Sequence, residues 1–334
     1  NAIVPHGSSQ RETEAAYVEA VNRLELLATD GARSIQEPLL DPPIVNGELP
    51  PVQSTMTKEE YCSAVEVAKE HILAGDIFQV VLSQRFDFDL NADSFDVYRV
   101  LRQTNPSPYM YYVRHNEVTL VGCSPEPMVQ VLGDRVISRP IAGTRARGKD
   151  EEEDRKLAAE LREHPKEIAE HVMLVDLARN DLGRVSRFGT LEIDEMMTLE
   201  NYSHVMHLTS QISGKLTKGK TPIDVIEATF PAGTVSGAPK VRAMQIIDDL
   251  EPTKRGPYAG IVGYFDLSGN VDNAIAIRTM VITESIASVQ AGAGIVADSD
   301  PESEYQECWN KAAALLAAVI PAERMTIKRK ESPL

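Results

Sequence analysis

Short β-rich segments stand in groups along this chain, and that grouping restricts its fold more than any other feature of the sequence. Turn residues separate the segments of the first half, which cover residues 77–85, 109–114, 118–121, 128–132 and 135–138. Strict alternation of strands with helices would indicate a parallel sheet, whereas short strands joined by turns favour antiparallel pairing. The sequence therefore predicts an α+β fold with large antiparallel sheets.

The second half of the chain repeats this mixture of elements. Its expected strands cover residues 205–213, 260–265, 273–283 and 286–290. The expected helices cover residues 57–74, 151–163, 166–177, 222–228, 239–250 and 301–320. Thr57 and Glu60 form a capping box at the start of the first helix. Asp300 is expected to cap the last helix, with Pro301 at its first position.

The N-terminal part of the chain has a different character from the rest. An amphipathic helix is expected over residues 11–29, and a proline-rich connection follows it. We therefore expect a peripheral N-terminal part over residues 1–56, a catalytic domain over 57–321 and a C-terminal tail over 322–334.

The composition excludes several classes of partner. A formal charge of −16 disfavours nucleic acid and anionic membranes. No apolar run approaches the roughly 20 residues of a membrane span, and no signal-peptide pattern is present, so a cytoplasmic protein is expected. Cys62, Cys123 and Cys308 are too scattered for a disulfide framework or a zinc site, and we interpret them as small buried residues. An anionic substrate would need local cations, backbone N–H groups or a metal ion.

A glycine loop joined to an acidic helix near the C-terminus is the strongest candidate for a binding site. Gly292 and Gly294 formally match a dinucleotide fingerprint, but the stretch 298–301 intervenes before the helix, which argues against that reading. Glu304, Glu307 and Lys311 share one face of the helix. A second pair, Glu167 and Glu170, could complete an oxygen-rich Mg²⁺ site, although such pairs are usually solvated helix faces.

Two histidines and two small-residue loops are weaker candidates. His204 and His207 lie three apart in a predicted strand and so face opposite sides, which allows at most one of them in a site. A structural histidine is the alternative for both. The loops 140–148 and 230–240 are rich in Gly and hydroxyl groups and suit a ligand wall, or they are only a solvated turn and a helix entry.

Taken together, the motifs occur in a family-specific order. They include Cys-Ser-Pro-Glu at 123–126, Pro-Ile-Ala-Gly-Thr at 140–144, Tyr-Ala-Gly-Ile-Val-Gly-Tyr at 258–264 and Ala-Ile-Arg-Thr at 276–279. Over residues 57–320 the chain resembles the chorismate-utilising enzymes, and within them the anthranilate synthase component I family. The resemblance implies large antiparallel sheets with helices outside and a site in a central cleft.

The resemblance assigns roles to individual residues. It implies that Glu170 and Glu307 ligate Mg²⁺ and that Glu167 and Glu304 support the metal. The positions that match substrate-binding residues of the family are Gly143, Thr144, Thr234, Tyr258, Arg278, Gly292, Ala293, Gly294 and Lys311. Chorismate is a dianion, and a metal ion with a bidentate arginine would hold its two carboxylates.

The reaction is implied by positions at which relatives differ. Relatives that add water carry a lysine base where this chain has Gln79, and one aminating type carries a nucleophilic lysine where it has Ala142. Both differences select addition of ammonia, followed by loss of pyruvate, to give anthranilate. Glu126 is the expected general acid for the leaving hydroxyl, and His207 matches the histidine of the elimination step.

Partners and regulation also follow from the resemblance. The family takes ammonia from glutamine through a separate amidotransferase subunit, and this sequence has no amidotransferase motif. Pro108, Tyr109 and Met110 match half of a tryptophan feedback site, and the other half is absent from the sequence, which indicates a fragment of a longer protein. The alternatives are an aminodeoxyisochorismate synthase, which stops before pyruvate loss, and a non-catalytic chorismate-binding subunit.

Overall fold

The computed structural model describes residues 2–33, 44, 47–201 and 205–331. The chain forms two compact units, residues 42–326 and residues 1–41 with 327–334. The smaller unit contains α1 (Gln10–Gly31), which begins at a capping box formed by Ser9 and Glu12. No described helix is long and apolar enough to cross a membrane. The expected domain boundaries at residues 56 and 321 stay predictions.

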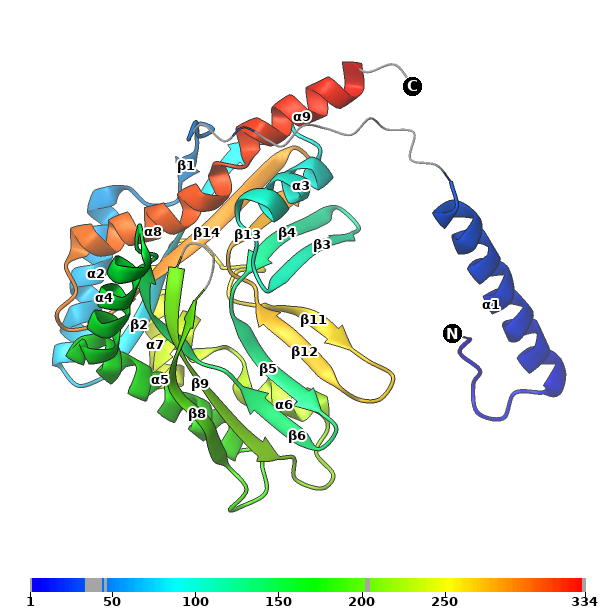
Figure 1. The fold of residues 1–334 in the computed structure, drawn as a ribbon, viewed down its shortest axis with the longest axis horizontal. Coiled ribbons are helices and arrows are strands. Elements are labelled where there is room, and N and C mark those ends of the chain that lie inside the picture. The colour runs from blue at the N-terminus through cyan, green and yellow to red at the C-terminus, as the bar shows by residue number, and fades with distance from the viewer. Residues whose placement is uncertain (1, 34–43, 45–46, 202–204, 332–334) are drawn as a thin grey trace. The chain divides into compact units, whose positions relative to one another are not determined.

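Two antiparallel sheets, each of seven strands within the described residues, organise the larger unit (Figure 1). The first contains β1 (Gln53–Ser54), β2 (Gln79–Asp89), β3 (Tyr109–His115), β4 (Val118–Ser124), β10 (Gly237–Ala238), β13 (Thr279–Thr283) and β14 (Ile286–Ile295). The second contains β5 (Pro127–Leu132), β6 (Arg135–Ser138), β7 (Ile141–Ala146), β8 (Glu192–Asn201), β9 (Val205–Lys215), β11 (Ile261–Phe265) and β12 (Val271–Ile275). The predicted α+β fold is confirmed.

Helices lie outside the sheets. They are α2 (Lys58–Leu73), α3 (Ser94–Thr104), α4 (Glu151–Glu163), α5 (Pro165–Gly183), α6 (Pro222–Thr229), α7 (Lys240–Leu250), α8 (Pro301–Leu316) and α9 (Val319–Glu331), with a 3₁₀ turn η1 (Gly233–Val235). α8 packs against β14 and α2, and α5 packs against β7 and β9. The predicted caps are present, since Thr57 and Glu60 form their capping box and Asp300 accepts from the Ser303 N–H. These caps fix where α2 and α8 begin.

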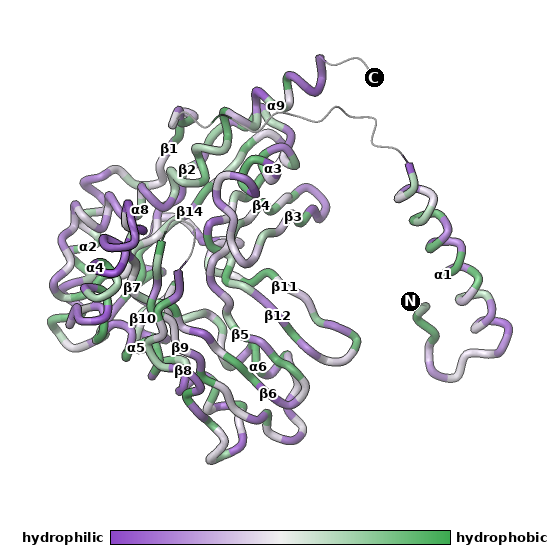
Figure 2. Tube along the Cα trace, in the orientation of Figure 1, coloured by the Kyte–Doolittle hydropathy of each residue, from purple (hydrophilic) through white to green (hydrophobic). Residues whose placement is uncertain are grey.

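Burial explains how the sheets and helices hold together. Val129, Val136, Ile212 and Val225 are fully buried in one apolar cluster between the second sheet and its helices. Figure 2 shows hydrophobic residues recurring along β5 and β6 and hydrophilic residues concentrated on α4. One face of the second sheet is therefore buried against its helices, whereas the first six residues of β2 in the first sheet, Gln79 to Gln84, are all buried.

Two of the places at which the chain crosses between the sheets are neighbours. One of these crossings joins β4 to β5, and the other joins β12 to β13. The Ser124 hydroxyl donates to the Ile275 carbonyl at 2.7 Å, and the Ile275 N–H donates to the Glu126 carbonyl at 3.0 Å. Arg278 stands in the second crossing with a positive φ of 49°. These bonds hold Glu126 and Arg278 at the junction of the sheets.

Several element predictions were wrong. The stretch 273–283, predicted as one strand, is β12 and β13 in different sheets, because the positive φ at Arg278 breaks the extended chain. The glycine loop is the end of β14, which pairs with β2 as far as Ile295. The turn expected at 140–148 contains strand β7, and the helix expected to reach Ile320 is divided into α8 and α9. β1, α3 and β8 were not predicted.

Candidate active site

An open cleft of about 510 Å³ lies beside α8. It is lined by Arg278, Ser303, Gln306, Glu307, Asn310 and Lys311. The α8 residues recur every three or four positions and so share one face of the helix. Burial lowers the pKa of Arg278, but a guanidinium stays charged at neutral pH. The cleft therefore presents the Arg278 and Lys311 cations beside the Glu307 carboxylate.

Lys311 joins the helix to the glycine end of β14. Its ammonium donates to the Gly292 carbonyl at 2.9 Å and lies 2.7 Å from the Glu307 carboxylate. β14 pairs with β2 from Ile286 to Ile295 but with β13 only as far as Val289. Because successive N–H groups of a strand point to alternate sides, every second N–H of the β14 residues after Val289 points away from β2. N–H groups in this position can donate to an anion.

Tyr258 explains why residue 292 is a glycine. A Cβ atom at Gly292 would lie 2.9 Å from the Tyr258 hydroxyl oxygen and 2.7 Å from the Leu82 carbonyl oxygen, so no side chain fits there. Burial raises the pKa of Tyr258, which keeps its hydroxyl protonated as a donor. Tyr258 and Gly292 therefore meet, as predicted, while Ala293 is fully buried and can offer only its backbone.

Gln79 occupies the corresponding place at Gly294. Its amide nitrogen lies 2.5 Å from the position of a Gly294 Cβ, and its side chain is 5% exposed. The Gln79 Oε1 atom is buried and has no hydrogen-bond partner among the described residues. A buried acceptor without a partner costs free energy, which indicates that a ligand supplies its donor.

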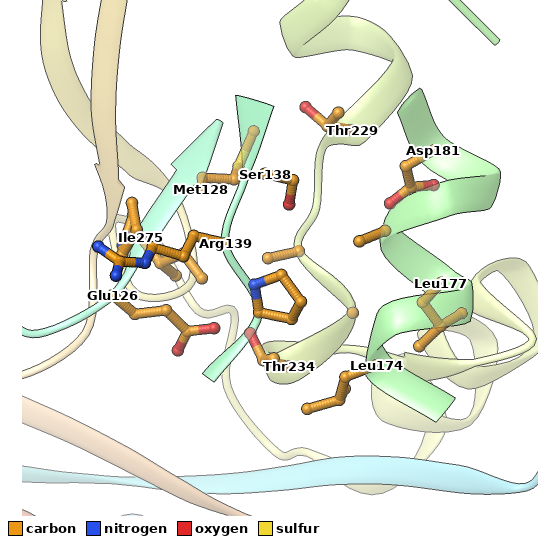
Figure 3. Close-up of a pocket in the computed structure, with 15 residues that line it drawn as sticks. Glu126, Met128, Ser138, Arg139, Leu174, Leu177, Asp181, Thr229, Thr234 and Ile275 are labelled. Atoms are coloured by element: carbon orange, nitrogen blue, oxygen red, sulfur yellow. The ribbon is translucent and has the colours of Figure 1, made fainter. Parts of the chain in front are cut away.

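Glu126 lines a small cavity of about 50 Å³ (Figure 3). Its lining is mostly apolar and includes Met128, Pro140, Leu174, Leu177, Ala178 and Ile275. Burial raises the pKa of Glu126 to about 7, although Thr234 and Lys311 act in the opposite direction. Figure 3 shows the Thr234 hydroxyl facing the Glu126 carboxyl. A carboxyl with this pKa is protonated in half of the molecules at neutral pH and can act as an acid.

His207 lies on β9 opposite the bulge of β7. Its Nδ1 atom is 3.4 Å from the Gly143 carbonyl oxygen, which selects the tautomer with a proton on Nδ1 and the lone pair on Nε2. Burial lowers the pKa of His207, so the ring is neutral at pH 7. Gly143 has a φ of 70°, and Thr144 pairs with His207 in the β7–β9 ladder. His204 lies outside the described residues.

The two glutamate pairs do not form one metal site in this structure. An Arg145 guanidinium nitrogen donates to Glu167 at 2.9 Å, and Lys311 forms the ion pair with Glu307. No group of three or more His, Cys, Asp or Glu side chains in the described part of the chain is placed to hold a metal ion. A basic side chain pairs with one carboxylate of each pair, so the four glutamates, which include Glu170 and Glu304, do not form a metal site in this arrangement.

Other predicted residues have a clear place. Ala142 is 8% exposed in β7 and pairs with Leu208. Tyr109 begins β3, and its hydroxyl donates to the Asp272 carboxylate at 3.0 Å, which ties the first sheet to the second. Pro108 is exposed and Met110 is half-buried beside it. The predicted tryptophan-site residues therefore lie at the edge of the first sheet.

Some residues that line the two cavities were not predicted. Ser303, Gln306 and Asn310 line the open cleft, and their helical spacing from Glu307 could have identified them. Asp181 lines the small cavity beside Glu126 and forms a 2.7 Å ion pair with Lys240. No local pattern in the sequence could predict this ion pair, because Asp181 belongs to α5 and Lys240 to α7.

Comparison with known proteins identifies the family of this site. A family model described as chorismate binding enzyme matches residues 3–317. The chain belongs to the chorismate-binding enzymes. It is 57% identical over 271 residues to anthranilate synthase component 1 of Thermus thermophilus, a match that covers 81% of this chain and 59% of that protein. The resemblance predicted from the motifs is therefore confirmed.

Two solved structures of chorismate-binding enzymes share the fold. Anthranilate synthase component I from Streptococcus pneumoniae matches with a TM-score of 0.80 at 41% identity, over 93% of this chain and 67% of that one. The menaquinone-specific isochorismate synthase from Escherichia coli matches with a TM-score of 0.78 at 27% identity, over 91% of this chain and 69% of that one. The chain spans 59% of the length of the Thermus thermophilus relative.

Proposed function

We propose that this chain carries the catalytic part of an anthranilate synthase, which converts chorismate and ammonia to anthranilate and pyruvate. The observation that supports this most is the position of Lys311, which reaches Gly292 and Glu307 and acts electrostatically on Glu126. An anion-binding surface and a carboxyl with a pKa of about 7 thereby adjoin one another. The names of the relatives at 57% and 41% identity support the same reaction.

Chorismate binding would use the open cleft and the end of β14. Arg278 offers a bidentate grip on one carboxylate, with the Tyr258 hydroxyl and the N–H groups beside Gly292 as further donors. Lys311 contributes a positive charge between this position and Glu126. The cations offset the desolvation of a dianion, which the overall charge of −16 would otherwise repel.

The first chemical step is addition of ammonia at C2 of the ring with departure of the C4 hydroxyl. Glu126 donates its proton to the leaving oxygen, which then departs as water. Gln79 cannot act as a base because its amide does not accept a proton at neutral pH. Ammonia already carries a lone pair and needs no such base, so Gln79 instead offers its buried Oε1 atom to the N–H of the nucleophile.

The second step is loss of pyruvate. The Nε2 lone pair of His207 takes the proton from C2, the bond between the ring and the enolpyruvyl oxygen breaks with its electron pair passing to that oxygen, and the ring becomes aromatic. The departing enolate takes a proton at its methylene carbon from the His207 imidazolium, which gives pyruvate and returns the histidine to its neutral form. The contact between Nδ1 and the Gly143 carbonyl fixes the tautomer this requires. An enzyme without a working base here would stop at aminodeoxyisochorismate, which is the second candidate function.

A magnesium requirement and two partners complete the proposal. Family resemblance and the acidic faces of α5 and α8 support Mg²⁺, and its binding requires Glu167 and Glu307 to give up their ion pairs with Arg145 and Lys311. The family resemblance supports a separate amidotransferase that supplies ammonia. Cys123 and Cys308 are buried as expected, whereas Cys62 is partly exposed. Tryptophan inhibition would act at the Tyr109 edge of the first sheet.

One experiment tests the proposed reaction. The chain is incubated with chorismate, an ammonium salt and MgCl₂, and anthranilate is measured by fluorescence while pyruvate is measured with lactate dehydrogenase. Equal amounts of both products support the proposal. Consumption of chorismate to an amino product without pyruvate identifies an aminodeoxyisochorismate synthase, and binding without consumption identifies a non-catalytic subunit.

A further inference from the structure

A buried ion pair behind the substrate site has no role in the reaction described above. The Arg255 and Glu251 side chains are 16% and 5% exposed. The Arg255 Nε atom donates to Glu251 Oε2 at 2.8 Å, and Nη2 donates to Oε1 at 2.6 Å. Glu251 thereby raises the pKa of Arg255 despite its burial. Since desolvating two charges is expensive, such a pair is retained only with further hydrogen bonds.

Those further hydrogen bonds reach two separate segments of the site. Arg255 Nη1 donates to the Val235 carbonyl at 2.6 Å, and Nη2 donates to the Val81 carbonyl at 2.8 Å. Glu251 Oε1 accepts from the N–H and the hydroxyl of Ser83, each at 2.8 Å. Val235 is the last residue of η1 and follows Thr234, whose hydroxyl faces Glu126. Val81 belongs to β2. The ion pair therefore ties η1 to β2.

The same guanidinium lies against the Tyr258 ring. The Arg255 Cζ atom is 5.4 Å from the centroid of that ring, a distance at which a cation attracts an aromatic face. The Tyr258 hydroxyl stands over Gly292, where a Cβ atom would approach it to 2.9 Å. Movement of Arg255 would therefore displace the hydroxyl of Tyr258 from the end of β14.

We infer that Arg255, oriented by Glu251 and anchored to η1 and β2, is a positioning residue that sets the place of Tyr258 at the end of β14. The inference rests on the proposed function, because Tyr258 contacts the substrate only if chorismate binds as proposed. A guanidinium has five donors in a fixed fork, whereas a lysine ammonium is a single point charge. Lysine at position 255 can keep the ion pair, but it cannot also hold both carbonyl groups.

The test is a double-mutant cycle on chorismate affinity, measured by isothermal titration calorimetry, which needs no turnover. Arg255→Lys should weaken chorismate binding about tenfold in the wild-type chain. In a Tyr258→Phe background the same change should weaken binding less than about twofold, because the positioned hydroxyl is already gone. The matched control is Arg242→Lys. Arg242 lies on the neighbouring α7 and forms an exposed ion pair with Asp76, so this change should leave the affinity for chorismate unchanged.

Two outcomes would overturn the inference. Equal losses from Arg255→Lys in both backgrounds would show that Arg255 does not act through Tyr258, while the proposed function would stand. Unchanged affinity in Tyr258→Phe alone would remove the substrate contact itself and the inference with it. Circular dichroism establishes that each variant is folded, and Glu251→Asp, which keeps both charges, replaces Arg255→Lys in the cycle if that variant loses its native spectrum.

Discussion

The two ends of the candidate site differ in how much water they admit. The narrow end is a cavity of about 50 Å³ with mostly apolar walls that Glu126 lines, and the open end is a cleft of about 510 Å³ that Arg278 and Lys311 line. Burial at the narrow end raises the pKa of Glu126 to about 7. At the open end the Lys311 and Glu307 side chains are 35% and 51% exposed.

This difference assigns different work to the two ends. A carboxyl whose pKa is raised by burial can donate a proton at neutral pH, while the cations that line the open cleft attract an anion. Substitutions at the narrow end should therefore lower kcat, and substitutions at the open end should mainly raise KM.

Glu126→Gln should have the largest effect. The amide keeps the shape of the side chain but cannot donate an acidic proton, so kcat should fall about 10³-fold with KM changed less than about threefold. Steady-state anthranilate production from chorismate and ammonium gives both constants. A variant with more than a tenth of the wild-type kcat would contradict the role of Glu126 as the acid.

His207→Met should separate the two chemical steps. Addition of ammonia does not need the imidazole, but loss of pyruvate does, so anthranilate release should fall about 10²-fold while an amino intermediate accumulates. Mass spectrometry of the products measures both. Normal anthranilate release by this variant would remove His207 from the mechanism.

Arg278→Lys should act at the open end. The charge remains, but the bidentate grip on a carboxylate is lost, so KM for chorismate should rise about tenfold with a smaller change in kcat. The result would be reversed, with kcat falling and KM constant, if Arg278 served the chemical step instead of binding.

Glu307→Gln tests the metal. Loss of one carboxylate from a magnesium site should weaken Mg²⁺ binding about tenfold in calorimetry. Glu302→Gln, which changes a more exposed glutamate of the same helix that pairs with Lys58, is the control. Equal Mg²⁺ affinity in Glu307→Gln and the control would show that the ion pair between Glu307 and Lys311 persists in the working enzyme.

Local sequence signals predicted the helices better than the ends of the strands. The capping residues Thr57 and Asp300 act within one turn, so the start of each helix could be derived from neighbouring residues. Gly292 and Gly294 indicated a loop, because glycine weakens a strand locally. They are held extended instead by pairing with β2, about 210 residues earlier in the chain, which no local pattern reports.

The same limit applies to the site. Motif order placed Glu126, His207, Tyr258 and Arg278 in one functional set, which stays a prediction. In the structure Glu126 and Arg278 lie at the junction of the sheets, and Arg278 acts electrostatically on His207 and Tyr258. Motif order could not identify Arg255, because an i, i+4 pair with an acidic residue usually marks a solvated helix face. The burial of that side chain results from three segments that meet only in the folded protein. For the predicted magnesium ligands, the sequence could not show that Glu167 and Glu307 form ion pairs with Arg145 and Lys311.

The pH dependence of kcat/KM for chorismate, measured at a constant concentration of unprotonated ammonia, tests the central claim most directly, since it reports the ionisation of the uncomplexed enzyme. Glu126 must be protonated to act, so kcat/KM should fall tenfold per pH unit above its pKa of about 7. His207 must be neutral, and because burial lowers its pKa, the acid limb should lie below pH 6.5. A profile that declines above about pH 7 supports Glu126 as the acid at the narrow end of the site. A profile that stays flat from about pH 7 to pH 9 would contradict it.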